Sequence, residues 1–290
     1  MRILLTGVTG FLGSHLARSL VREGYVVTGI KREGSSMARV QDIEKDIRWF
    51  AADSSGGVDS AAFVDIDTVI HTATAYGRRG ETNTAIALAN MLFPLTVLEG
   101  ATQAGVRRFI NTDTIVPRAT NAYSLSKAQF VEWGRLLAGT GISEFINIRL
   151  EHLYGPGDDE SKFSCYVINA CLRNQSELHL TAGTQKRDFI YVADAVEAYA
   201  QVVRQSEAIP DGFVEIPVGS GLAIPVREFV ETIHQMAHSS TRLLFGALPT
   251  GSDEVLYSCA DLTKMKGLRW KPVTALRDGL EITIRSDAQR

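Results

Sequence analysis

A glycine-rich segment near the N-terminus constrains the fold of this chain more than any other feature. Gly7, Gly10 and Gly13 follow the apolar run Ile3–Leu5 and lead into a stretch with helical periodicity. In a strand–glycine–helix unit, the first glycine permits a tight turn and the second lets the backbone approach a pyrophosphate. The third lets the helix pack against the strand, and the helix N-terminus then binds the pyrophosphate. The residues expected to line this dinucleotide site are Gly7, Thr9, Gly10, Phe11, Leu12 and Gly13.

The rest of the first half alternates short apolar runs with stretches of helical periodicity. Near-continuous apolar runs are typical of parallel strands covered by helices on both faces. The expected strands lie around 3–5, 25–27, 47–50, 68–70, 109–110 and 145–148, and the expected helices over 11–23, 84–104 and 123–138. The repeated strand–helix–strand order predicts an α/β fold with a doubly wound parallel sheet of the Rossmann type.

The sequence texture changes after Gly155, where loops lengthen and the alternation loosens. We therefore expect a dinucleotide-binding domain over residues 1–155 and a smaller, mixed substrate-binding lobe over most of 156–290. Residues 187–205 are expected to return to the main sheet. The chain has no internal repeats and no low-complexity segment.

Composition excludes several classes of function. The net charge of −3 lacks the basic excess of a nucleic-acid-binding protein. No apolar run approaches the ~20 residues of a membrane span, and the apolar stretch before Gly7 is too short for a signal peptide. Cys165, Cys171 and Cys259 have neither disulfide-framework nor zinc-site spacing. We expect a cytoplasmic protein with a small-molecule partner, no nucleic-acid or membrane partner and no metal.

The residues at the end of the second expected strand bear on the choice of cofactor. NAD-binding units usually place Asp or Glu there to hold the ribose 2′-hydroxyl, whereas this strand ends in Lys31 and Arg32. A carboxylate would repel a 2′-phosphate, and a guanidinium binds one with paired hydrogen bonds. The two cations favour NADP (as NADPH) over NAD; the alternative is that they are ordinary surface charges.

Tyr123 and Lys127 stand four residues apart, on one face of an expected helix. A nearby ammonium favours the phenolate and lowers a tyrosine pKa. The same lysine could hold the ribose hydroxyls of a nicotinamide. Downstream of a dinucleotide site, this pair is a candidate acid–base couple.

Together these residues resemble the extended short-chain dehydrogenase/reductase family, which comprises nucleotide-sugar epimerases, dehydratases and 4-ketoreductases. Segments 71–74, 149–157, 187–194 and 268–272 carry the resemblance along the whole chain. It implies a homodimer. The cofactor contacts that it implies beyond the glycine-rich segment are Asp53, Ser54, Thr72, Ala73, Thr74, Asn90, Tyr123 and Lys127.

The family's third catalytic group is a Ser or Thr at the end of the fifth strand. One register assigns this hydroxyl to Thr114, which we favour, and a second, matching the Thr-Asp-Glu of dehydratases, assigns it to Thr112. In the second register Thr114 replaces the dehydratase Glu. Elimination would then lack its proton-transferring carboxylate, which argues against a dehydratase.

The resemblance also implies a nucleotide-diphosphate sugar as substrate, with contacts from Tyr76, His152, Phe163 and Arg187. Arg187 would bind the diphosphate; alternatively it is the salt-bridge partner of Asp188 or Asp194. His152 stands where many relatives have an Asn, and it is either a sugar contact or a structural histidine. The second phosphate-binding Arg that relatives often carry near residues 250–253 is missing.

Segments 111–113, 149–158 and 160–163 are most similar to nucleotide-sugar 4-ketoreductases of the CDP-abequose synthase type. This implies NADPH-dependent reduction of the 4-keto group of a CDP- or dTDP-linked deoxysugar, for polysaccharide of the O-antigen type. An NAD-dependent 4-epimerase is the alternative enzyme. A non-catalytic NADP-sensing protein is a further alternative, although it would not need Tyr123 or Lys127.

Overall fold

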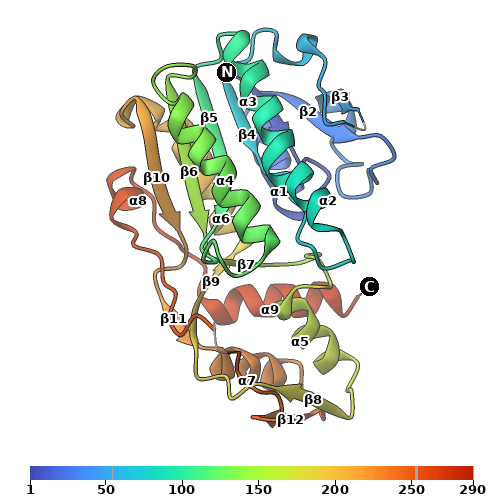
Figure 1. The fold of residues 1–290 in the computed structure, drawn as a ribbon. Helices are drawn as coiled ribbons and strands as arrows, with labels where there is room; N and C mark the ends of the chain where they lie inside the picture. The colour runs from blue at the N-terminus through green and yellow to red at the C-terminus, as the bar shows by residue number, and fades with distance from the viewer. Residues whose placement is uncertain (54, 252–253, 290) are drawn as a thin grey trace. The chain divides into compact units, whose positions relative to one another are not determined.

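Seven strands form the main sheet of the computed structural model, which describes residues 1–53, 55–251 and 254–289. The strands lie in the order β10-β6-β5-β4-β1-β2-β3 (Figure 1). Their bounds are β1 Arg2–Thr6, β2 Val26–Arg32, β3 Ile47–Ala52, β4 Thr68–His71, β5 Arg108–Thr114, β6 Glu144–Leu150 and β10 Gly212–Val218. The pairs from β3 to β6 are parallel. The strand order reverses between β1 and β4, the place where doubly wound sheets bind ligands.

The helices of this part of the chain begin and end where local sequence permits. They are α1 Phe11–Arg22, α2 Asn83–Ala87, the π-helical turn η3 Leu88–Leu92, α3 Phe93–Gln103 and α4 Ala122–Leu137. Short 3₁₀ turns are η1 Glu44–Asp46, η2 Ser60–Phe63 and η4 Ser206–Ala208. The single helix expected over 84–104 is thus interrupted by η3. The last part of this stretch, α3, ends just before Gly105, whose φ of 71° suits the end of a helix.

Stacked aromatic rings fill the core between α4 and the sheet. Phe109 of β5 and Phe145 of β6 lie with ring centres 5.4 Å apart and planes 3° from parallel. Phe130 of α4 packs edge-on against both rings. Gly134 lets α4 approach, because a Cβ there would lie 2.1 Å from the Phe145 ring. This packing sets the distance between α4 and the end of β5.

One helical stretch, Asn83–Gln103, is long and apolar enough to span a membrane by length and composition. This differs from the expectation that no apolar run approaches that length. Val97, Leu98 and Ala101 of this stretch are fully buried members of the hydrophobic core. Packing within the fold therefore accounts for the apolar residues on the buried side of this stretch, whereas Leu88 and Leu92 are exposed.

The second part of the chain has a small mixed sheet in the order β11-β9-β7. Strand β7 is parallel to β9, and β11 is antiparallel to it. A separate parallel pair joins β8 and β12. The elements are β7 His152–Tyr154, α5 Phe163–Leu172, β8 Glu177–Leu180, β9 Lys186–Tyr191, β11 Ala223–Pro225, α7 Val226–Met236, β12 Arg242–Phe245, α8 Thr263–Gly267 and α9 Leu276–Asp287.

The chain divides into one unit of Met1–Leu150 with Tyr199–Ile216 and another of Glu151–Ala198 with Pro217–Arg290. The first break therefore falls at residue 150 rather than 155, and the segment that rejoins the first unit is 199–216 rather than 187–205. Helix α6 (Val192–Arg204) and strand β10 both continue across the division. The predicted fold class, a doubly wound parallel sheet with a smaller mixed sheet, is confirmed.

Candidate active site

The glycine-rich turn joins β1 to α1 with little space for side chains. Gly7 has a φ of 70°, and a Cβ on it would lie 2.6 Å from the backbone nitrogen of Ala73. A Cβ on Gly13 would lie 2.1 Å from the carbonyl oxygen of Gly7. Gly10 caps α1 without a side chain, so the first-turn N–H groups remain available to an anion. Thr9, Phe11 and Leu12 of the same turn are half-buried. These residues fit a dinucleotide pyrophosphate.

The loop after β4 lies directly against this turn. Thr72 donates a hydrogen bond from its hydroxyl to the carbonyl oxygen of Thr6 at 2.8 Å. The neighbouring His71 is buried, and its Nδ1 lies 2.8 Å from Thr6 Oγ1. The expected cofactor contacts Thr72 and Ala73 thus meet the glycine-rich turn at the switch point between β1 and β4, whereas the Thr74 hydroxyl donates to Asn90.

Lys31 and Arg32 are the last two residues of β2. They pair with Ala51 and Ala52 at the end of the neighbouring strand β3. Lys31 is half-exposed and Arg32 is exposed. Asp53 follows, but its Oδ1 accepts hydrogen bonds from the Ser55 hydroxyl at 2.6 Å and the Gly57 N–H at 2.8 Å. The hydrogen bond from Ser55 is the main reason that the pKa of Asp53 is lowered. The Asp53 carboxylate therefore stabilises the turn that follows β3. Ser54, the other contact expected here, lies outside the described residues.

Asn90 performs a structural task that the sequence does not reveal. It is buried in the π-helical turn, where its amide accepts from the Ala75 N–H and donates to the Ala75 carbonyl, both at 2.8 Å. The amide also accepts from Thr74 Oγ1 and donates to Ser126 Oγ, both at 3.2 Å. Both amide atoms are thus engaged by protein. Asn90 anchors the loop after β4 to α4 rather than presenting a free amide to a cofactor.

The N-terminus of α4 is defined by a capping box. Asn121 Oδ1 accepts from the Ser124 N–H at 2.9 Å, and Ser124 Oγ accepts from the Asn121 N–H at 3.2 Å. Tyr123 therefore lies in the first turn and Lys127 one turn later. The Lys127 ammonium is 5.9 Å from the Tyr123 ring centre and donates to the carbonyl oxygen of Thr112 at 2.6 Å.

The two candidate threonines of β5 make different contacts. The Thr114 hydroxyl lies close enough to Tyr123 to lower the pKa of that phenol, and it accepts a hydrogen bond from the Val116 N–H at 3.2 Å. Thr112 Oγ1 instead accepts from the hydroxyl of Tyr199, a fully buried residue of α6, at 2.7 Å. Thr114 is therefore the threonine whose hydroxyl lies beside Tyr123, whereas the Thr112 hydroxyl contacts Tyr199, a residue that the sequence analysis missed.

The electrostatics of this group differ from the sequence-based expectation. Burial is the main reason that the pKa of Tyr123 is raised, and it outweighs the lowering by the Thr114 hydrogen bond and by the charge of Arg78. Burial also lowers the pKa of Lys127 to about 8, against a smaller rise from Asp113. Lys127 does not make the tyrosine more acidic than usual here. The phenol is protonated at neutral pH.

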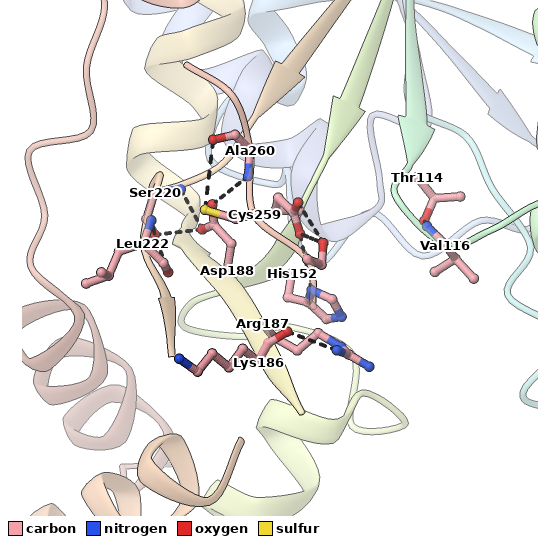
Figure 2. A network of polar contacts seen from close by, with 12 residues as sticks. Thr114, Val116, His152, Lys186, Arg187, Asp188, Ser220, Leu222, Cys259 and Ala260 are labelled. Carbon is pink, nitrogen blue, oxygen red and sulfur yellow. Dashed lines mark hydrogen bonds and ion pairs between the residues drawn. The ribbon is translucent and has the colours of Figure 1, made fainter. Parts of the chain in front are cut away.

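Arg187, in the second unit, is buried on β9 and has a carboxylate partner. Its guanidinium donates to the Lys186 carbonyl at 2.9 Å (Figure 2). It also pairs with Glu254 Oε1 at 2.5 Å. Burial is the main reason that its pKa is lowered. The partner is neither Asp188 nor Asp194, the two carboxylates considered from the sequence. Sequence reasoning missed Glu254 because it lies 67 residues away.

Those two aspartates accept hydrogen bonds from other groups. Asp188 is fully buried, and its carboxylate accepts from the N–H groups of Ser220 and Ala260 (Figure 2). It also accepts from the N–H of Gly221. Asp194 accepts from the N–H groups of residues 273 and 274. Both side chains therefore hold loops in the second unit.

The two remaining expected substrate contacts also lie in the second unit. His152 packs against Phe189 with ring centres 5.7 Å apart, and its buried Nδ1 has no hydrogen-bond partner within the described part of the chain. That nitrogen is 3.6 Å from the carboxylate of Glu151, which accepts from Ser258 Oγ at 2.7 Å. Phe163 is the exposed first residue of α5. The buried Nδ1 of His152, without a hydrogen-bond partner among the described residues, suits a polar ligand.

Comparison with known proteins agrees with this arrangement. Residues 3–216 match the model of the NAD dependent epimerase/dehydratase family. The chain belongs to the NAD-dependent epimerase/dehydratase family. This confirms the resemblance found in the sequence.

Relatives within the epimerase/dehydratase family are similar over nearly the whole chain. CDP-abequose synthase of Salmonella typhimurium is 31% identical, with 96% of each chain covered. A putative UDP-glucose 4-epimerase of Methanocaldococcus jannaschii is 25% identical, again with 96% of each covered. The crystal structure of UDP-glucuronic acid 4-epimerase from Bacillus cereus, with UDP-glucuronic acid and NAD, superposes with a TM-score of 0.88 over 100% of this chain and 99% of that one. At 22% identity, that likeness concerns the fold.

Proposed function

We propose that this protein catalyses the NADPH-dependent reduction of the 4-keto group of a CDP- or dTDP-linked deoxysugar. The observation that carries the proposal is the group at the end of β5. There the hydroxyl of Thr114 lies beside a half-buried, protonated Tyr123, one helical turn from a buried Lys127. The similarity to CDP-abequose synthase supports a CDP-sugar as substrate.

The residues of the first unit that would hold the dinucleotide are those of the glycine-rich turn, the loop after β4, and Lys31 and Arg32 for a 2′-phosphate. Asp53 and Lys127 would contact its adenosine and nicotinamide-ribose parts. Asn90 would act by holding the loop in place. When bound, the dinucleotide supplies the hydride for the carbonyl carbon.

The chain's own residues would handle the proton. Tyr123 donates its phenolic proton to the substrate oxygen as negative charge develops on it, and the raised pKa keeps that proton available at neutral pH. Thr114 hydrogen-bonds the same oxygen, a small oxyanion site. Lys127 carries a positive charge at the end of β5, close to both groups.

Residues of the second unit would bind the nucleotide sugar. Arg187 is proposed for the diphosphate, and His152 and Phe163 for the sugar or nucleotide. Tyr76 of the first unit, which lies against Tyr123, would be a further contact. The orphaned Nδ1 of His152 supports a polar partner there.

A homodimer in the cytoplasm completes the proposal. Exposed apolar side chains lie on the adjacent helical segments η3 and α4 of the first unit, a surface that would suit an isologous interface. They are Leu88, Leu92, Leu125, Trp133 and Leu136. Light scattering of the purified chain tests the dimer.

An NAD-dependent 4-epimerase is the second candidate, because epimerases occur among the relatives and the same three side chains would serve it. Mass spectrometry of the purified protein for retained cofactor, followed by NADPH oxidation assays with a panel of 4-keto nucleotide sugars, separates the two. Stoichiometric NADPH oxidation with one of these sugars supports the reductase. Retained NAD together with interconversion of 4-hydroxy sugars would establish the epimerase. Binding of NADPH without turnover would indicate an NADP-sensing protein.

A further inference from the structure

The loop after β4 places an aromatic ring and a cation beside the proposed proton donor. The ring centres of Tyr76 and Tyr123 are 5.2 Å apart, with planes 35° from parallel. The Arg78 guanidinium carbon lies over the Tyr76 ring, 5.1 Å from its centre. The three side chains form a row of contacts from an exposed cation to a half-buried phenol.

The base of this loop is held in place. The amide of Asn90 makes two hydrogen bonds to the backbone of Ala75, the residue before Tyr76, and a third to Ser126 of α4. The start of the Tyr76–Arg78 segment is thus tied to the helix that carries Tyr123. A guanidinium over an aromatic face is attracted by the ring quadrupole, which favours the stacked position of Arg78.

We propose that Arg78, acting through Tyr76, is a positioning residue that orients the Tyr123 phenol and stabilises the negative charge left on its oxygen after proton donation. The inference rests on the proposed function of Tyr123. It predicts that the charge of Arg78, and not only the bulk of its side chain, contributes to turnover.

The charged and titratable groups around Tyr123 come from several elements. Burial, Tyr76 of the loop and Asp113 of β5 raise the pKa of Tyr123, while the Thr114 hydrogen bond and the charge of Arg78 lower it. Lys127 lies one turn away on α4, and Tyr199 of α6 interacts electrostatically with Tyr123. Arg78 is exposed, so its charge can be removed without disturbing the buried groups.

Three variants test the inference. Arg78→Gln removes the charge, Arg78→Lys keeps it, and Arg79→Gln removes the neighbouring exposed cation as a matched control. The first measurement is the steady-state kinetics of NADPH oxidation with a CDP-linked 4-keto-6-deoxyhexose. For Arg78→Gln we expect kcat to fall about threefold, as one solvent-screened charge implies. KM should be unchanged, and Arg78→Lys should restore most of kcat.

A second measurement does not depend on turnover. A fluorinated tyrosine, whose phenol is intrinsically more acidic, is introduced at position 123, and its ionisation is followed by fluorine NMR. Arg78→Gln should raise the titration midpoint by about half a pH unit, and Arg79→Gln should leave it in place.

An unchanged midpoint in Arg78→Gln overturns the inference. So does a raised KM with an unchanged kcat, which would make Arg78 a substrate contact. If the parent protein reduces no 4-keto nucleotide sugar, the proposed function fails, and the NMR titration still decides whether Arg78 acts on residue 123.

Discussion

The Lys127 ammonium donates a hydrogen bond to the backbone carbonyl oxygen of Thr112 at 2.6 Å. This contact joins α4 to the end of β5, two residues before Thr114. It compensates in part for the burial that lowers the pKa of Lys127 to about 8. The hydrogen bond therefore holds a cation and fixes the spacing between Thr114 and the helix that carries Tyr123.

Replacing Tyr123 by Phe should separate catalysis from folding. Because the phenol is the proposed proton donor, we expect turnover to fall about 10²–10⁴-fold. NADPH affinity and the melting temperature should stay near those of the parent, since the ring and its contact with Tyr76 remain. Steady-state kinetics, fluorescence titration and thermal unfolding check this. Normal turnover in the variant would assign the proton donor to another residue.

The two threonines of β5 should respond differently to replacement by Val. Thr114→Val removes the hydroxyl beside Tyr123 that is proposed to bind the substrate oxygen, and it should lower kcat about 10²-fold with little change in stability. Thr112→Val leaves the fully buried Tyr199 hydroxyl without its acceptor, which should cost about 1–3 kcal/mol of unfolding free energy. Rate constants and urea unfolding curves measure both effects. The reverse pattern would assign the catalytic hydroxyl to Thr112.

Lys31 and Arg32 should determine the preference between cofactors. The parent should bind NADPH more tightly than NADH, and the double variant Lys31→Gln/Arg32→Gln should narrow the difference by about 1–3 kcal/mol, the worth of charge-assisted hydrogen bonds. Isothermal titration with both dinucleotides measures the difference. Lys45→Gln, which removes an exposed cation of the same unit, is the control. Equal affinities in the parent would contradict the assignment.

The Arg187–Glu254 ion pair should compete with nucleotide binding. A diphosphate that pairs with Arg187 must displace the Glu254 carboxylate, so Glu254→Gln should tighten the binding of CDP by about tenfold, or ~1.4 kcal/mol. Arg187→Gln should weaken it. Glu281→Gln removes the carboxylate of an exposed pair on α9 and serves as the control. Calorimetric titration with CDP measures all three, and an unchanged Kd in both Arg187→Gln and Glu254→Gln would move the diphosphate elsewhere.

His71 should make the fold sensitive to acid. Burial, and next the charge of Lys127, lower its pKa to about 3 from 6.5, so the folded protein keeps it neutral while the unfolded chain takes up a proton. The resulting loss of unfolding free energy is absent above pH ~6.5. It grows by about 1.4 kcal/mol per pH unit as the pH falls toward ~3.

The test compares His71→Asn with its parent by urea unfolding. Between pH ~6.5 and ~4.5 the parent should lose about 2 kcal/mol more unfolding free energy than the variant. His179→Asn, at an exposed histidine, should follow the parent. Parallel pH dependences in the parent and His71→Asn would contradict the prediction.

The local patterns were sufficient for the architecture. The six expected strands of the parallel sheet lie within or beside β1 to β6, because an apolar run bounded by turns has few other stable structures in a sheet covered on both faces. The expected helix over 84–104 is interrupted only at η3, where Asn90 is hydrogen-bonded to Ala75 in the loop after β4. Helical periodicity carries no information about such a contact. Motif spacing likewise predicted that Tyr123 and Lys127 share one helix face.

The contacts that define the candidate site depend on residues far apart in sequence. Thr112 meets Tyr199, Arg187 meets Glu254 and Asn90 meets Ser126, each through the side chain and separated by 36 to 87 residues. No local pattern encodes such pairs. Burial in the finished fold also reversed the expected effect on the Tyr123 pKa, since desolvation exceeds the influence of any neighbouring charge. The sequence by itself thus determined the strands, the helices and the dinucleotide turn, whereas only tertiary packing decided each side chain's partner and the protonation state that follows from it.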